Sequence, residues 1–162
     1  MTSARIATNY HRETIAYQRR RICDLLGGKV KTGRISKSRY FNELRNSKVV
    51  ISPFGWGEYA MRDYEAFIGG ALLLKPDMSH LETYPALYRD GETMIALRWD
   101  AEDLLERLDA IHSNYQEFLD IAKCGQETYR MHVTSREGAD RFVRHFSGIV
   151  SDAIHSRSSS AG

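Results

Sequence analysis

The sequence predicts an α/β fold in which a Rossmann-like parallel sheet is flanked by helices and followed by a C-terminal helical segment. Two apolar runs, residues 48–52 and 71–75, support this prediction, because a helical pattern separates them. Short apolar runs of this kind are typical of strands that are buried on both faces. The order strand, helix, strand is that of a parallel sheet with crossover helices.

Two helices are expected before the first of these strands. Apolar residues recur at helical spacing over residues 12–26, and Gly27 with Gly28 supplies a stop. Residues 28–33 have the pattern of a short strand, and Ser36 or Ser38 can cap a second helix.

After the strand at 48–52, a Pro/Gly loop leads into a helix expected at 58–68, which ends at Gly69 and Gly70. The second apolar strand follows at once, and a further strand is expected at 93–97. Three helices close the chain, with starts at Asp100, Asn114 and Ser135, and we expect their apolar stripes to lie in the core.

Composition predicts one globular domain. The chain has 162 residues, of which 42% are hydrophobic and 27% charged, unlike the charge-rich, apolar-poor pattern of disordered chains. We expect one domain over residues 1–154, with its core in 28–150, and a disordered tail at 155–162, because that ending is small and polar.

The N-terminus lacks the apolar stretch of a signal peptide, and the longest nearly unbroken apolar run, residues 67–74, is too short for a transmembrane segment. A cytoplasmic location is therefore predicted. The two cysteines, Cys23 and Cys124, and the six histidines show no ligand spacing, so the sequence predicts neither a metal site nor a cofactor.

Charge is distributed unevenly. Residues 1–50 hold 12 Lys or Arg against 3 Asp or Glu, whereas residues 51–162 hold 11 against 18. A basic segment raises the local concentration of anionic partners such as a sugar nucleotide or a polyanion.

The most informative stretch is residues 47–77, where a buried strand runs into a glycine loop and then a helix. Free backbone N–H groups and the positive end of the helix dipole meet at such a helix start, which makes it a predicted anion site. On the expected helix, Glu58, Arg62 and Glu65 are spaced to share one face. Arg62 is suited to a diphosphate, and a carboxylate to the hydroxyls of a ribose or hexose.

This stretch resembles the C-terminal, donor-binding domain of GT-B glycosyltransferases, in particular the group-1 and the exostosin-like or CgeB-like branches. The resemblance rests on the Pro53-Phe54-Gly55 strand exit, the Arg62-Asp-Tyr-Glu65-Ala66 helix, and the Gly69-Gly70 turn before an apolar strand. It extends through the segments 88–93 and 100–105 and covers about residues 40–129.

The resemblance implies a glycosyltransferase that uses a nucleotide-sugar donor such as a UDP- or GDP-sugar. It places the donor diphosphate or sugar at the helix start, whose residues are Gly55, Trp56, Gly57 and Tyr59. Arg62 would neutralise phosphate, Glu65 would bind the ribose, and Glu58 would face the transferred sugar as the candidate catalytic residue. Six residues separate Glu58 from Glu65, where many retaining members have seven. One residue turns a helix by ~100°, so the stereochemistry of transfer stays open.

GT-B enzymes carry an acceptor-binding domain before this one, and transfer takes place between the two. A chain of 162 residues supplies one wall of that cleft. The chain is thus expected to be a fragment, to work with a separate acceptor-domain subunit, or to bind donor without turnover. The acceptor, whether glycan, lipid or protein, is left open.

Two alternatives come from other classes. Residues 55–60, GWGEYA, fit the G-x-G-x-x-A fingerprint of an NAD(P)-binding Rossmann domain, with Asp77 at the end of the next strand. A basic nucleic-acid-binding module is the second alternative, and it would place on phosphates the cations Arg19, Arg20, Arg21, Lys29, Lys31, Arg34, Lys37 and Arg39.

Overall fold

The computed structural model describes residues 1–159, with side chains through residue 156. Its centre is a four-stranded parallel sheet in the order β1 (Thr2–Ser3), β2 (Val49–Ile51), β3 (Leu72–Pro76) and β4 (Ile95–Leu97). The parallel α/β sheet and the strands expected at 48–52, 71–75 and 93–97 are confirmed.

The first strand is not where the sequence predicted it. Residues 28–33 form turns and bends, and the strand that pairs with β2 is Thr2–Ser3, with Thr2 opposite Val49. The core likewise begins before residue 28, because Ala4 and Ile6 are buried in it. A strand of two residues carries almost no period-2 pattern, which is why the sequence did not reveal it.

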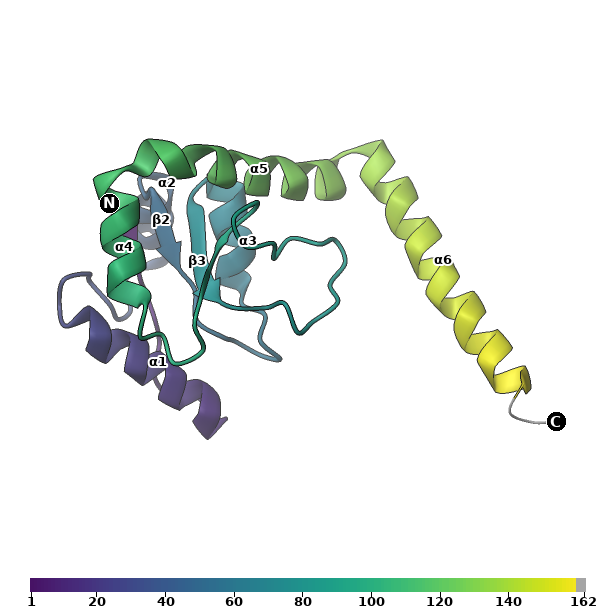
Figure 1. Ribbon diagram of the computed structural model, residues 1–162, viewed down its shortest axis with the longest axis horizontal. Coiled ribbons are helices and arrows are strands. Elements are labelled where there is room, and N and C mark those ends of the chain that lie inside the picture. Colours follow the sequence, from purple (N-terminus) through teal and green to yellow (C-terminus); the bar gives the residue numbers. More distant parts are fainter. Residues whose placement is uncertain (160–162) are drawn as a thin grey trace.

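The two faces of the sheet are covered by different helices (Figure 1). Side chains alternate along a strand. Val49 and Ile51 therefore pack with α1 (Glu13–Leu26) and α4 (Leu104–Ser113), and Val50 packs with α2 (Lys37–Arg45) and α3 (Met61–Gly69). The expected first helix is confirmed, and it ends at Gly27 in the left-handed conformation.

Helix α5 (Tyr115–Thr134) crosses the amino ends of the strands (Figure 1). Its Tyr115 hydroxyl donates to the carbonyl of Lys48, and a Cβ on Gly125 would lie 2.5 Å from the carbonyl of Thr93. The carboxyl ends of the strands are left for the site described below.

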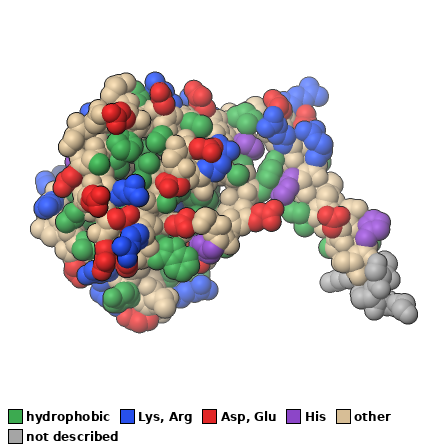
Figure 2. All heavy atoms as spheres, viewed as in Figure 1, with side chains coloured by type: hydrophobic (Ala, Val, Ile, Leu, Met, Phe, Trp, Pro, Cys, Tyr) green, Lys and Arg blue, Asp and Glu red, His purple; other side chains and the backbone are tan. Residues whose placement is uncertain are grey.

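Helix α6 (Arg136–Ser159) projects away from the body (Figures 1 and 2). Its Phe142, Val143 and Phe146 are 54%, 60% and 56% exposed, so the expectation that this apolar stripe lies in the core was wrong. The helix also continues through residues 155–159, which the sequence assigned to a disordered tail. No proline or glycine interrupts the chain between Gly148 and Ser159, so helical hydrogen bonding propagates. Residues 160–162 lie outside the described part.

Over the described residues, no helix combines the length and the apolar content that crossing a bilayer requires.

Candidate functional site

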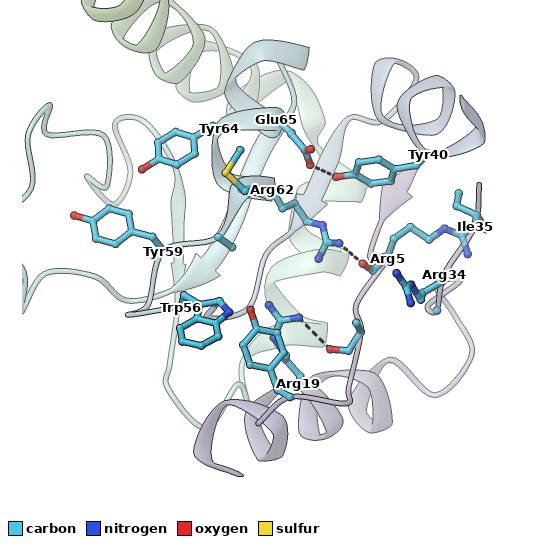
Figure 3. Close-up of a pocket in the computed structure, with 16 residues that line it drawn as sticks. Arg5, Arg19, Arg34, Ile35, Tyr40, Trp56, Tyr59, Arg62, Tyr64 and Glu65 are labelled. Carbon is cyan, nitrogen blue, oxygen red and sulfur yellow. Dashed lines mark hydrogen bonds between the residues drawn. The ribbon is translucent and has the colours of Figure 1, made fainter. Parts of the chain in front are cut away.

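A cavity of about 550 Å³ opens beyond the carboxyl ends of β1 and β2, at the amino end of α3 (Figure 3). In open α/β sheets, ligands bind beyond the carboxyl ends of the strands. The residues that line the cavity come from four segments of the chain: Arg5, Ala7, Tyr10 and Arg19; Gly33, Arg34, Ile35 and Tyr40; Gly55, Trp56 and Tyr59; and Ala60, Met61, Arg62, Tyr64 and Glu65.

Arg19 is the most deeply buried cation of the cavity, at 6% exposure. Its Nε donates to the carbonyl of Phe54 at 2.8 Å and its Nη1 to the carbonyl of Ala7 at 3.0 Å, while its guanidinium lies 4.4 Å from the centre of the Tyr10 ring. Burial lowers the pKa of Arg19, and the neighbouring Arg62 adds to the effect. An arginine nevertheless stays protonated. The cavity thus holds a fixed positive charge whose direct contacts are two backbone carbonyls and an aromatic ring.

Arg62 is the second such cation. Its Nη2 donates to the carbonyl of Arg5, and its guanidinium lies 6.0 Å from the centre of the Tyr40 ring. Its Nε is buried and has no hydrogen-bond partner within the described chain. A buried N–H without a partner costs free energy that an incoming acceptor can recover.

The charge balance of the lining is strongly positive. Among its four arginines, only Arg5 forms an ion pair within the described part of the chain, at 2.6 Å with Glu43. Arg34 is exposed, and no described carboxylate lies within 4 Å of Arg19, Arg34 or Arg62. Glu65 is the single acidic residue of the lining. This imbalance suits a ligand with more than one negative charge.

Glu65 extends from α3 toward Tyr40 of α2 (Figure 3). The Tyr40 hydroxyl donates to Glu65 Oε2 at 2.5 Å. Burial, and next the hydrogen bond to this carboxylate, raise the pKa of Tyr40 to about 12. Tyr40 therefore stays a neutral donor that fixes the Glu65 side chain.

Aromatic rings form one rim of the cavity. Trp56 is 67% exposed, with the Tyr10 ring 6.4 Å away and the Arg12 guanidinium 5.5 Å from its own ring. A large exposed ring beside a cationic pocket offers a stacking surface to a planar or sugar group.

The segment between β2 and α3 forms a tight turn where the sequence predicted the first turn of a helix. Trp56 and Tyr59 pair across an isolated antiparallel bridge, and Gly57 and Glu58 between them have φ values of 58° and 76°. Helix α3 therefore starts at Met61 and not at Glu58. The prediction of an anion site at a helix start over Gly55–Tyr59 is corrected on this point, because these residues precede the helix.

Gly55 is required by the turn itself. A Cβ at this position would lie 2.2 Å from the carbonyl oxygen of Tyr59. The sequence predicted that Gly55 and Gly57 make room for a ligand, whereas Gly55 makes room for the backbone of Tyr59 and Gly57 supplies a left-handed turn residue.

A buried polar network holds this turn in place. Lys75 Nζ lies 3.2 Å from Asp63 Oδ2 and donates to the carbonyl of Glu58 at 2.8 Å, and both side chains of the ion pair are fully buried. Asp63 Oδ1 accepts from Ser52 at 2.5 Å, and Oδ2 accepts from the Tyr88 hydroxyl and from the Ala60 N–H.

Burial lowers the pKa of Lys75, and Asp63 opposes that shift. This network was not predicted from the sequence, where its one signal is a lysine near the end of an otherwise apolar strand.

The structure separates Glu58 from Arg62 and Glu65. Glu58 does not line the cavity, and its Oε2 lies 2.6 Å from His80 Nε2. The His80 ring in turn packs against the Trp99 ring. The prediction that Glu58, Arg62 and Glu65 share one helix face is therefore wrong for Glu58, because the turn at Gly57 directs it away. Gly57 also lies outside the lining, whereas Gly55, Trp56, Tyr59, Arg62 and Glu65 lie together in it.

The geometry does not favour the NAD(P) fingerprint. In that motif the glycines open a helix, but residues 56–59 form a turn. Asp77, the expected ribose ligand of that alternative, accepts hydrogen bonds from the N–H and the hydroxyl of Ser79 and lines a different cavity.

The basic set of the nucleic-acid alternative is also divided in space. Arg19 is buried in the cavity, Arg20 pairs with Glu13, and Arg21 lies 3.7 Å from Glu102.

Comparison of the chain with protein-family models, with curated proteins and with solved structures gives no match.

Proposed function

We propose that this chain is the nucleotide-sugar-binding half of a GT-B-type glycosyltransferase, with its donor site in the cavity between β1, β2 and α3. The observation that carries the proposal is the pair of guanidiniums, Arg19 and Arg62, which face one cavity and have no carboxylate partner among the described residues. A diphosphate supplies the two or more negative charges that such a pair accommodates.

The donor diphosphate lies on Arg19 and Arg62 in this proposal, and the Arg62 Nε donates to one of its oxygens. Glu65, oriented by Tyr40, accepts hydrogen bonds from the ribose hydroxyls. The exposed Trp56 ring forms the rim of the donor site, together with Tyr59. The anion thus contacts side chains rather than the backbone amides of residues 55–59.

Sugar transfer breaks the bond between the anomeric carbon and a diphosphate oxygen, and forms a bond from that carbon to the acceptor oxygen. Negative charge grows on the leaving diphosphate, and fixed guanidiniums stabilise it without reorganisation. In an inverting transfer, the acceptor proton passes to a base on the opposite wall, which an acceptor domain or separate subunit supplies. We assign no step to Glu58, because its carboxylate is engaged with His80 outside the cavity.

The test is a ligand screen by thermal shift, followed by calorimetry, against UDP, GDP, ADP, CMP, NAD and UDP- or GDP-sugars. A ligand that binds only the folded state stabilises it, by about 2.7 kcal/mol at a concentration of 100 times Kd. We expect a nucleoside diphosphate or its sugar to raise Tm more than CMP does. Binding of NAD alone, or a response to none of these nucleotides, would overturn the proposal.

Glu65→Ala separates ribose recognition from phosphate binding. We expect this variant to weaken nucleoside diphosphate binding by ~1–3 kcal/mol, the range for a polar group left without its partner, and to leave inorganic pyrophosphate binding unchanged. Equal affinity of variant and wild type for the nucleotide would remove Glu65 from the site.

A further inference from the structure

Helix α6 carries an apolar face that the rest of the described chain does not cover. The helix meets the body at its first turns, where the Tyr84 ring stacks on His145 at 4.1 Å and lies 6.3 Å from Phe142. Beyond that contact the helix extends into solvent, with hydrophobic side chains along it (Figure 2).

The exposed apolar residues lie on one side of the helix. Phe142, Phe146, Ile149 and Val150 follow one another at intervals of four, three and one residue, and their exposures are 54%, 56%, 54% and 41%. Spacings of three and four residues place side chains on a common face. Between residues 142 and 150 this face carries no charged residue, because helical geometry places Arg144 on the opposite side. Arg141, just before the face, forms an ion pair with Glu137 at 2.5 Å.

Such a face destabilises an isolated arm. Apolar area exposed to water is less favourable than buried apolar area, and most helical stability in proteins comes from packing of the apolar side. A contiguous apolar patch of this kind marks an interaction surface.

We propose that the covering partner is α6 of a second copy of this chain, packed antiparallel about a two-fold axis at the level of Gly148. A two-fold interface must be complementary to itself. The α6 sequence meets this condition, because apolar residues stand at equal distances on either side of Gly148: Phe146 and Val150 two residues away, and Val143 and Ala153 five residues away.

In each of these pairs a larger side chain meets a smaller one. The two-fold axis brings Phe146 of one copy against Val150 of the other, and Val143 against Ala153. Large-against-small alternation of this kind lets facing layers interdigitate. Arg144 and Asp152, each four residues from Gly148, lie on the outer side of both helices.

The area available sets the expected strength. Half-exposed side chains at five positions, Phe142, Val143, Phe146, Ile149 and Val150, present on the order of 500 Å² per copy, so the dimer buries about 1,000 Å² in total. This area is near the lower limit for specific interfaces. We therefore expect a reversible dimer with a dissociation constant in roughly the micromolar range. This inference does not depend on the ligand of the cavity.

The test is sedimentation equilibrium of the full chain over about 1–300 μM, which brackets that dissociation constant. Wild type is expected to shift from monomer to dimer with concentration. Phe146→Asp places a charge at the centre of the interface and is expected to weaken dimerisation at least tenfold. The matched control Arg144→Asp places the same side chain on the opposite face and is expected to dimerise like wild type. Far-UV circular dichroism verifies that each variant keeps its helices, and Val150→Asp repeats the test at the facing position.

Wild type that stays monomeric at the highest concentration would overturn the proposal and would indicate that another macromolecule covers the face. A dimer that persists in both Phe146→Asp and Val150→Asp would overturn it as well, because the contact would then lie elsewhere.

Discussion

Lys75 and Asp63 form an ion pair with a 3.2 Å separation and no solvent exposure of either side chain. The pair connects the end of β3 to the start of α3. Through the Glu58 carbonyl, which accepts from Lys75, it also fixes the turn beside the cavity. The geometry of the candidate donor site therefore depends on residues that do not line it.

Removing one partner of this pair should be strongly destabilising. Lys75→Met leaves the Asp63 carboxylate buried without its cation, and a broken buried pair typically costs about 3–5 kcal/mol. Urea unfolding of the variant measures the loss. Arg141→Ala, which breaks the exposed pair with Glu137, serves as the control and should change stability by less than about 0.5 kcal/mol. Equal effects of the two variants would contradict the assigned role of Lys75.

Gly55 and Gly57 should respond differently to alanine. A Cβ at Gly55 collides with the Tyr59 carbonyl at 2.2 Å, whereas at Gly57 nothing lies within 4 Å and only the φ of 58° opposes a side chain. We expect Gly57→Ala to cost about 1 kcal/mol. Gly55→Ala should cost more and should also weaken ligand binding, because Tyr59 must move. Denaturant midpoints and calorimetric affinities of the two variants provide the comparison, and a larger loss at Gly57 would be inconsistent with the turn.

Arg62 should contribute to binding of the diphosphate more than to folding. Arg62→Gln removes the charge and the Nε donor, which has no hydrogen-bond partner among the described residues. Affinity should therefore fall by roughly 10- to 100-fold, as expected for one charge-assisted hydrogen bond of about 1.5–3 kcal/mol. Calorimetry with the best nucleoside diphosphate from the screen gives the value. Arg45→Gln makes the same change on the exposed side of α2, outside the cavity, and should bind as wild type does. A loss of equal size in both variants would indicate general electrostatics instead of a specific contact.

The raised pKa of Tyr40 should make the free energy of unfolding fall at alkaline pH. Its pKa is raised from 10.0 to about 12 in the folded protein. Above pH 10 the unfolded chain therefore releases this proton before the folded protein does. The contribution of Tyr40 is complete below pH 10 and is lost as the pH rises toward 12. The difference in unfolding free energy between wild type and Tyr40→Phe should accordingly shrink as the pH is raised above 10. A difference that grows with pH would show that the phenol is not held neutral.

The sequence revealed the sheet wherever a strand was long enough to have a pattern. The runs that became β2, β3 and β4 were predicted from their apolar composition, whereas β1 has two residues and escaped detection. Helix starts at Asn114 and Ser135 were recognised from capping residue types, and of the two serines predicted to cap α2 it is Ser36 that occupies the N-cap position. The start expected at Asp100 was misplaced, because Asp103 precedes the first residue of α4. The start of α3 was misplaced by three residues, because Gly57 and Glu58 adopt left-handed conformations that helical spacing does not reveal.

The sequence by itself determined the parallel α/β fold, because short apolar runs and the helical pattern between them are local properties. The strand-loop-helix segment is local as well, and it pointed to Gly55, Trp56, Tyr59, Arg62 and Glu65. Only the tertiary structure brought Arg19, Tyr10 and Tyr40 to those residues, since it folds segments of α1, α2 and the β1–α1 connection over the ends of the strands. The tertiary structure also turned Glu58 toward His80 and left the apolar face of α6 uncovered. Burial and charge pairing depend on which distant segments meet, and local spacing carries no information about that.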